Sequence, residues 1–327
     1  MKKASVPSVL VAVTLFVVGM RAEAQKPKLY RVGVLPQPGS LEELPRIKGL
    51  RDGLANLGYI EAKTLQLNIP KIKMVDELRP IANTYIENRV DVILSIGGTA
   101  TSIAKEATKD LPIVFMAVSA DPVEMGFVKS LARPETNLTG LTSTTGSEFE
   151  GKRLELFKEI VPNLRRLVLL YNARGDSPGH AMRVAQLREV APKLGIKLNE
   201  RPVKSVADVD EALRTFSKQI ADGIFIIGSG LFREPCRKIV TVAIAKKIPL
   251  WGCERQQSFL SSYSADEHHY GHSAAWYVDK ILQGAKPTDL PVKRPIKFVF
   301  IINLKTATQI GLTIPSNVLA KADRVIK

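Results

Sequence analysis

Short, almost wholly apolar segments recur along the chain and alternate with longer segments of mixed polar and apolar residues. Residues 32–35, 91–96 and 167–171 are examples of the short segments, and a polar stretch with glycine or proline follows each of them. Strands that are buried on both faces show such continuous apolar runs, and the longer segments, of about 10 to 20 residues, have the length of helices. The pattern predicts an α/β fold with doubly wound parallel sheets.

The same order of elements occurs twice. The strand, polar loop and helix that begin near Tyr30 begin again at Arg166, and residues 91–98 are matched by residues 222–229. Two equivalent halves, each with its own sheet, explain this repeat. In such sheets ligands bind outside the carboxyl ends of the strands, and two such edges that face each other form a cleft. The loops that follow the strands are therefore the first candidates for a ligand site.

The C-terminal part of the chain departs from the repeat. It contains, in order, a predicted strand at 259–263, a helix at 266–283, a proline-marked link, a strand at 298–302 and a short terminal helix. A chain that passes between the two halves more than once explains this order, with passages near residues 142–146, 264 and 291. Several connections of this kind form a hinge.

Composition and charge narrow the classes of protein. The 327 residues are 45% hydrophobic and 24% charged, which fits a chain with a large core and excludes disordered and collagen-like chains. The net charge of +15 comes from 47 Lys and Arg against 32 Asp and Glu. These basic residues are scattered, and short groups such as Lys293-Arg294 carry no interleaved aromatic residues. We expect a solvated basic surface and no nucleic-acid partner.

The first 24 residues have the pattern of a secretory signal peptide. Lys2 and Lys3 precede an apolar run at 9–18, and the sequence A-E-A at 22–24 forms a cleavage site before Gln25. The apolar run is shorter than the roughly 20 residues of a membrane-spanning helix. We therefore expect cleavage of this segment and export to the periplasm.

The cysteines and a histidine cluster leave alternatives open. Cys236 and Cys253 form either one disulfide in an oxidising compartment or two buried thiols. His268, His269 and His272 lie at the start of a predicted helix, but no further zinc ligands stand at a recognisable spacing. We expect no metal and no cofactor, and histidines that face solvent or edge the cleft.

The loop after the predicted strand at 91–96 is suited to an anionic group. This loop is predicted at 97–102 and opens a predicted helix at 103–108, so the amides and a hydroxyl of Gly98, Thr99 and Ala100 can bind a carboxylate or a phosphate. A tight turn with a capping hydroxyl is the alternative. Asp121, which precedes a proline, can meet a ligand ammonium or simply start a turn. Other candidates in loops of this half are Gln37, Ser40 and Ser119.

The second half offers candidates in its first, third and fourth loops. They are Asn172 and Ser177, Ser229 and Leu231, and Trp251 and Glu254. An aromatic side chain beside polar groups suits an amphipathic small molecule. Packing of Trp251 in the core is the alternative.

Sequence signs of catalysis are weak. The chain has no Gly-x-Ser-x-Gly turn, no P-loop and no dinucleotide fingerprint. Amino-acid racemases of the two-cysteine type also pair two related α/β lobes, but they take one thiol from each lobe. Both cysteines here fall in the second half. We therefore expect a binding protein and not an enzyme.

Ordered motifs run from Arg31 to the end of the chain. They include R-V-G-V-L at 31–35, G-L-R-D-G-L-A-N-L-G-Y at 49–59, N-L-T-G-L at 137–141, G-K-R-L-E-L-F-K at 151–158 and I-N-L-K-T-A at 302–307. In these motifs the chain resembles the substrate-binding proteins of ABC importers, in the branch similar to tryptophan/tyrosine-binding proteins.

The resemblance implies a type I periplasmic-binding fold, in which two lobes joined by three crossovers close on a ligand like a hinged trap. Lobe 1 is expected at 25–143 plus 265–291, and lobe 2 at 144–264 plus 292–327. The resemblance assigns Gly98, Thr99 and Ala100 to a ligand carboxylate, and Asp121 and Asn172 to polar contacts. Ala173 and residues 265–269 depart from the usual residues of the family, so the ligand need not be an aromatic amino acid.

These features together predict the periplasmic substrate-binding component of an ABC importer. It would capture a small carboxylate-bearing ligand, an amino acid or an aromatic acid, in the interlobe cleft. It would act as a monomer and deliver the ligand to a permease in the inner membrane. A periplasmic sensor subunit that docks on a receptor would share the fold and the ligand site, so the sequence leaves open both the ligand and this choice of partner.

Overall fold

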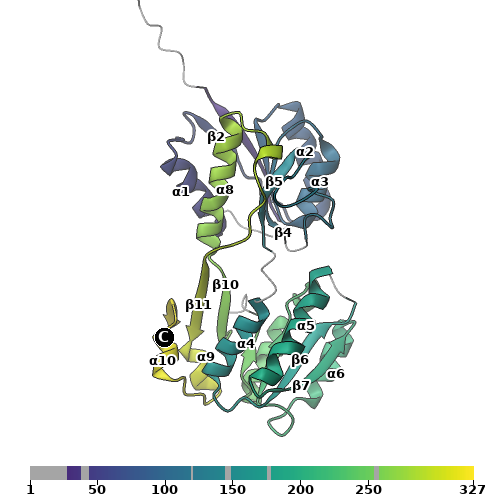
Figure 1. The fold of residues 1–327 in the computed structure, drawn as a ribbon, viewed down its shortest axis with the longest axis vertical. Coiled ribbons are helices and arrows are strands. Elements are labelled where there is room, and N and C mark those ends of the chain that lie inside the picture. The colour runs from purple at the N-terminus through teal and green to yellow at the C-terminus, as the bar shows by residue number, and fades with distance from the viewer. Residues whose placement is uncertain (1–27, 38–43, 119–120, 144–148, 175–177, 254–257) are drawn as a thin grey trace, which may run out of the picture.

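The computed structural model describes residues 28–37, 44–118, 121–143, 149–174, 178–253 and 258–327. Within these ranges the strands form three sheets, and two α/β lobes lie one above the other with extended segments between them (Figure 1). The doubly wound α/β architecture expected from the repeat is confirmed.

Lobe 1 contains a parallel sheet in the order β2-β1-β3-β4-β5. Successive side chains of a strand point to opposite faces, so Leu94 packs toward α1 whereas Ile93 packs toward α2 and α3. Helices therefore cover both faces of the sheet, as its continuous apolar strands require. The strands are β1 (Tyr30–Leu35), β2 (Leu65–Asn68), β3 (Val92–Ile96), β4 (Ile113–Val118) and β5 (Leu138–Thr142), and the helices are α1 (Pro45–Asn56), α2 (Leu78–Glu87) and α3 (Gly98–Ala107).

Lobe 2 repeats this arrangement with a parallel sheet in the order β7-β6-β8-β9. Leu169 packs toward α4 and α5, and Leu170 packs toward α6 and α7 on the opposite face. The strands are β6 (Arg166–Asn172), β7 (Lys197–Val203), β8 (Gly223–Ile226) and β9 (Leu250–Trp251), and the helices are α4 (Phe149–Ile160), α5 (Pro178–Lys193), α6 (Val206–Thr215) and α7 (Cys236–Ala245).

Three passages of the chain join the lobes. The first follows β5, the second is β10 (Ser261–Ala265), and the third runs from Lys293 into β11 (Phe298–Asn303). β10 and β11 pair antiparallel, and β12 (Arg324–Ile326) extends their sheet. Between the second and third passages α8 (Glu267–Leu282) packs in the core of lobe 1, whereas α9 (Leu304–Gln309) and α10 (Ser316–Leu319) pack in the core of lobe 2. The three-crossover hinge is thereby confirmed.

Helices α1 and α8 cross at backbone contact distance. A Cβ atom added at Gly271 would lie 1.8 Å from the carbonyl oxygen of Arg46, and one at Gly49 would lie 1.9 Å from that of His268. Only glycine fits such an approach without a shift of the backbone. The close crossing fixes α8 to lobe 1, although the second crossover leads into this helix from lobe 2.

Candidate functional site

The carboxyl edges of the two main sheets face the space between the lobes. In lobe 1, β5 leads from this edge directly into the crossover to lobe 2, and the other strands run parallel to it. In lobe 2, Arg183 of α5 donates a hydrogen bond to the carbonyl of Gly228 after β8 and also pairs with Glu150, where the chain enters from lobe 1. We call the loops along these two edges the interlobe site.

Helix α3 begins earlier than the sequence indicated. We expected a loop at 97–102 and a helix from Ile103, but the helix starts at Gly98. Gly97 adopts a φ of 86°, which favours glycine, and lets the chain turn directly from β3 into the helix. The Thr101 N–H then donates to the Gly97 carbonyl at 3.1 Å, and its hydroxyl contacts Ser95 at 2.9 Å.

The first turn of α3 presents free donors to the interlobe site. The backbone N–H groups of Gly98, Thr99 and Ala100 have no hydrogen-bond partner in the described part of the chain, as is usual in the first turn of a helix. A Cβ atom at Gly98 would meet no atom within 4 Å, and Thr99 is exposed. The Ala100 side chain is buried in the lobe 1 core, so only its backbone faces a ligand.

Two further candidates of lobe 1 lie on the same edge. The Asp121 Oδ1 atom accepts the N–H groups of Val123 at 2.8 Å and Glu124 at 3.3 Å, so one oxygen of this carboxylate stabilises the turn after β4. Its Oδ2 atom has no partner among the described residues. Gln37 is half-buried just beyond β1. Ser40 and Ser119 lie outside the described residues.

The end of β4 carries a strained residue that the sequence did not reveal. Ala117 has a φ of 60°, at a register shift between β4 and β5. Its N–H donates to the Tyr270 hydroxyl at 3.1 Å, and this hydroxyl donates to the Leu141 carbonyl at 2.7 Å. Burial raises the pKa of the Tyr270 phenol, so the group keeps its proton and its hydrogen bond. One α8 side chain thus holds the ends of β4 and β5 together.

In lobe 2 the candidate residues have different environments. Asn172 is buried at the end of β6, where its Oδ1 atom accepts the Arg174 N–H at 3.0 Å. Ser229 is half-buried, and its hydroxyl oxygen has no hydrogen-bond partner in the described ranges. Leu231 is half-buried against the core formed with α6 and α7. Ser177 and Glu254 lie outside the described residues.

Trp251 lies in the core of lobe 2. Its side chain is 0% exposed, its ring stacks on Phe225 with 6.1 Å between centroids, and the Phe157 ring lies 5.7 Å away. The structure therefore agrees with the alternative that Trp251 packs in the core. The ring packs in the core beneath the loops of the interlobe site, and its side chain does not line the site in this conformation.

A buried ionic cluster underlies the lobe 2 edge. Glu150 is 1% exposed, and its carboxylate lies 2.6 Å from Arg183 and 3.4 Å from Arg153. The Arg153 guanidinium also lies 5.7 Å from the Trp251 ring centre. Burial by itself raises the pKa of Glu150, but the two arginines outweigh it and hold the pKa below its ordinary value. The cluster joins the start of α4 to α5 and, through Arg183, to the Gly228 carbonyl after β8, and sequence reasoning missed it.

The comparisons with known proteins agree with this geometry. A model of the ABC transporter substrate binding protein family matches residues 38–326. The chain belongs to this family. Since the family consists of substrate-binding proteins, the expectation of a non-enzymatic protein is confirmed, and the racemase alternative is excluded.

Three relatives document the similarity of this substrate-binding protein. It is 25% identical over 290 residues to a tyrosine-binding protein of Clostridioides difficile, covering 88% of this chain and 81% of the relative. A conserved domain protein of Vibrio cholerae is 30% identical, with a TM-score of 0.71 over 91% of this chain and 100% of its own. A protein of Streptococcus pneumoniae solved with L-Trp is 25% identical, with a TM-score of 0.74 over the same shares. The type I periplasmic-binding fold is thereby confirmed.

Two of the clustered histidines of this substrate-binding protein connect two helices of lobe 1. His268 lies 2.8 Å from Asp52, and His272 lies 3.3 Å from Asn56, so both contact side chains of α1 from α8. Groups of three or more metal-binding side chains do not occur in the described ranges. The same ranges contain no helix with the length and apolar character of a membrane span.

Cys236 and Cys253 form a disulfide between the start of α7 and the loop after β9. This settles the alternative that the sequence left open, and it places both sulfur atoms in lobe 2. The bridge closes a loop with a sequence separation of 17, at the carboxyl edge of the sheet. It holds a loop of the interlobe site against α7.

Removal of this disulfide is expected to destabilise lobe 2. By the loop-entropy model, a bridge across a loop of this length contributes about 3 kcal/mol to the free energy of unfolding. Urea titration of the Cys236→Ser/Cys253→Ser variant, beside the wild type with and without reductant, measures the effect. Equal unfolding midpoints for the variant and the oxidised wild type would contradict it.

Proposed function

We propose that this protein is the extracytoplasmic receptor of an ABC importer and captures a small carboxylate-bearing ligand, an amino acid or an aromatic acid, at the interlobe site. The observation that carries the proposal is the first turn of α3. Three backbone N–H groups point to an edge where Gly98 leaves space, and a helix N-terminus favours a negative charge.

The surroundings of this turn support an amino acid more than a plain anion. The Oδ2 atom of Asp121 is available to an ammonium group, because Oδ1 alone forms the turn. Across the interlobe space, Ser229 offers a buried hydroxyl whose hydrogen bond is not made within the described residues. The names of the relatives, one tyrosine-binding and one solved with L-Trp, support aromatic amino acids as the first ligands to test.

Export and delivery form the second part of the proposal. The signal-peptide pattern of the first 24 residues supports a periplasmic location, and membership of the family supports a permease in the inner membrane as the partner. Ligand uptake that stops when the protein is deleted would support the importer. Uptake that continues while a ligand-dependent signal is lost would point to a sensor.

Thermal denaturation in the presence of single compounds tests the ligand class. A ligand that binds only the folded protein, present at 100 times its Kd, is expected to raise Tm by about 5 °C or more. The panel contains the amino acids, aromatic acids, and sugars as the control class. A stabilising sugar together with inactive carboxylates would overturn the proposed ligand class.

A further inference from the structure

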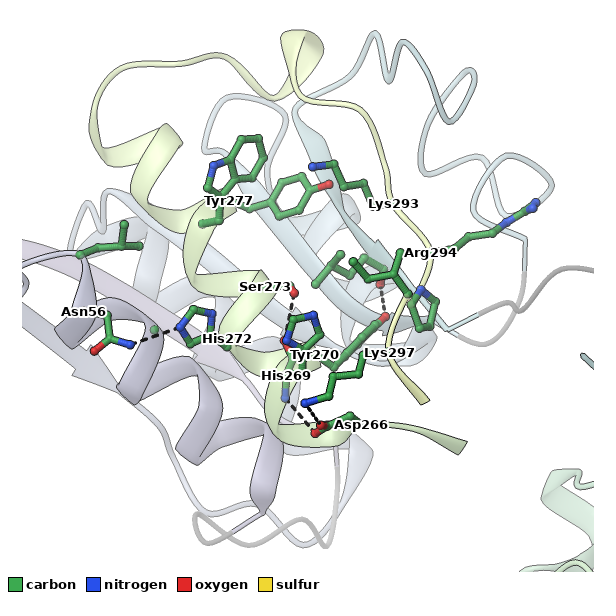
Figure 2. Close-up of a pocket in the computed structure, with 16 residues that line it drawn as sticks. Asn56, Asp266, His269, Tyr270, His272, Ser273, Tyr277, Lys293, Arg294 and Lys297 are labelled. Atoms are coloured by element: carbon green, nitrogen blue, oxygen red, sulfur yellow. Dashed lines mark hydrogen bonds and ion pairs between the residues drawn. The ribbon is translucent and has the colours of Figure 1, made fainter. Parts of the chain in front are cut away.

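A groove lies on the hinge, outside the interlobe site. It has a volume of about 350 Å³ and is shown in Figure 2. The lining lies beside all three crossovers: Leu141 is in β5 just before the first, Asp266 directly follows the second, and residues 293–297 belong to the third. Helices α1 and α8 complete the walls, and no candidate residue of the interlobe site is part of the lining. The groove is large enough for a small organic ligand.

The lining combines an apolar floor with a cationic rim. Trp276, the largely buried Tyr277 and Ile296, which is 85% exposed, are apolar or aromatic members of the lining. The Lys293 Nζ atom lies 4.6 Å from the centre of the Trp276 ring, and Figure 2 shows its neighbour Arg294 on the same segment. Such a surface suits a flat apolar body that carries a negative charge.

The charges of the rim are not balanced within the groove. Asp266 is the one acidic residue of the lining, and Lys297 already neutralises it at 3.1 Å. Lys293 and Arg294 are exposed, and neither forms an ion pair with any described residue. These two residues belong to a short basic group in the sequence that the interlobe site does not use. An anion that enters the groove would therefore meet the Lys293 ammonium, while the Arg294 side chain extends outward from the same segment and adds positive charge near the rim (Figure 2).

The walls of the groove belong to parts that move with different lobes. Helix α8 is fixed to lobe 1 by its glycine contact with α1, whereas the segment at 294–297 continues into β11 and lobe 2. The Asp266 N–H donates to the Lys297 carbonyl at 2.9 Å, and the Thr142 N–H donates to that of Lys293 at 3.0 Å. A rotation of the lobes about these crossovers must change the shape of the groove.

We propose that the groove is a second ligand site, for a small amphipathic carboxylate, and that its occupant holds the lobes apart. The sheet layers of the two lobes share no extended packing within the described residues, so the groove has its present shape in a conformation with separated lobes. A ligand that fits this shape favours this conformation. It therefore weakens ligand binding at the interlobe site, where closure is required. This last effect rests on the proposed function, but binding in the groove does not.

Calorimetric titration with 2-naphthoate tests the groove directly. The Gly98→Trp variant is used first, because its interlobe site is filled by the new side chain. We expect one molecule of 2-naphthoate to bind this variant. In the Gly98→Trp background, Lys293→Gln/Arg294→Gln should weaken binding about tenfold or more, since charge-assisted contacts are lost. Lys286→Gln/Lys305→Gln removes the same charge from other exposed positions and should leave the affinity unchanged.

Two results would overturn the proposal. One is no binding of 2-naphthoate to Gly98→Trp, and the other is equal affinity with and without Lys293 and Arg294. The effect on the hinge is measured by comparing the wild type with Lys293→Gln/Arg294→Gln. The same concentration of 2-naphthoate should weaken binding of L-Trp, or of another interlobe ligand, about fivefold or more in the wild type and much less in the variant. Equal weakening in both proteins would indicate direct competition at the interlobe site and would refute the effect on the hinge. Unchanged affinity would refute the effect on the hinge. If no interlobe ligand exists, the proposed function fails, while the titration of Gly98→Trp still decides the groove.

Discussion

Replacing Gly98 with tryptophan is expected to abolish ligand binding at the interlobe site while the protein stays folded. The new side chain would start at a position where a Cβ atom meets no atom within 4 Å, so the core is undisturbed. It would cover the N–H groups of α3 that we assign to the ligand carboxylate. The expected loss of affinity is about 100-fold or more, equivalent to about 3 kcal/mol.

Calorimetry and thermal denaturation together check this expectation. Lys109→Trp is the matched control, because it adds the same side chain to an exposed position beyond the other end of α3. Gly228→Trp tests the lobe 2 side of the interlobe site in the same way, because a Cβ atom at Gly228 also meets open space. If Gly98→Trp bound the ligand with wild-type affinity and an unchanged Tm, the N-terminus of α3 would not be part of the ligand site.

Replacing Glu150 with glutamine is expected to cost about 3 to 5 kcal/mol of the free energy of unfolding. The substitution keeps the size of the side chain but leaves the buried Arg153 and the partly exposed Arg183 without their carboxylate. Loss of one partner from a buried ion pair has costs of this size. Urea denaturation measures the change, and Glu155→Gln is the control, because the pair of Glu155 with Lys152 is exposed.

The pH dependence of stability distinguishes this ionic role from simple packing. Because the folded state lowers the pKa of Glu150 below its ordinary value of 4.5, ionisation of this group stabilises the protein above that pH. The contribution is lost as the pH falls below 4.5 and through the folded-state pKa. The stability difference between wild type and Glu150→Gln should therefore shrink on acidification. A difference that stays constant between neutral pH and pH 3 would contradict the ionic role.

The apolar strand pattern and its repeat were sufficient to predict two doubly wound α/β halves, whereas the type I fold with three crossovers was implied by the family resemblance. The runs that became β3 and β8 are buried on both faces, which is why they could be recognised without knowledge of their partners. Boundaries that depend on single backbone angles could not be predicted in the same way. The start of α3 was misplaced because Gly97 adopts a positive φ and turns the chain within one residue.

The sequence alone did not reveal the residues whose role depends on packing between distant elements. Glu150 and Arg153 look like charges on an ordinary amphipathic helix, and only the packing of α4 against β9 and α5 makes them buried. From the sequence, Trp251 could either line the ligand site or pack in the core, and only its stacking on Phe225 decides between the two. The hydroxyl of Tyr270 joins β4 to β5, although Tyr270 lies more than a hundred residues further along the chain than either strand, so no local pattern encodes the contact.

The most direct test of the central claim is a calorimetric titration that compares ligands with and without a carboxylate. L-Trp and L-Tyr are titrated into the purified protein beside tryptamine and tyramine, and the wider panel of amino acids and aromatic acids follows. We predict that at least one carboxylate binds at a 1:1 ratio, that its amine analogue without the carboxylate does not, and that Gly98→Trp removes the binding. Binding of the amine as tightly as the amino acid, or of no carboxylate at all, would contradict the assignment of the α3 N-terminus as the ligand site.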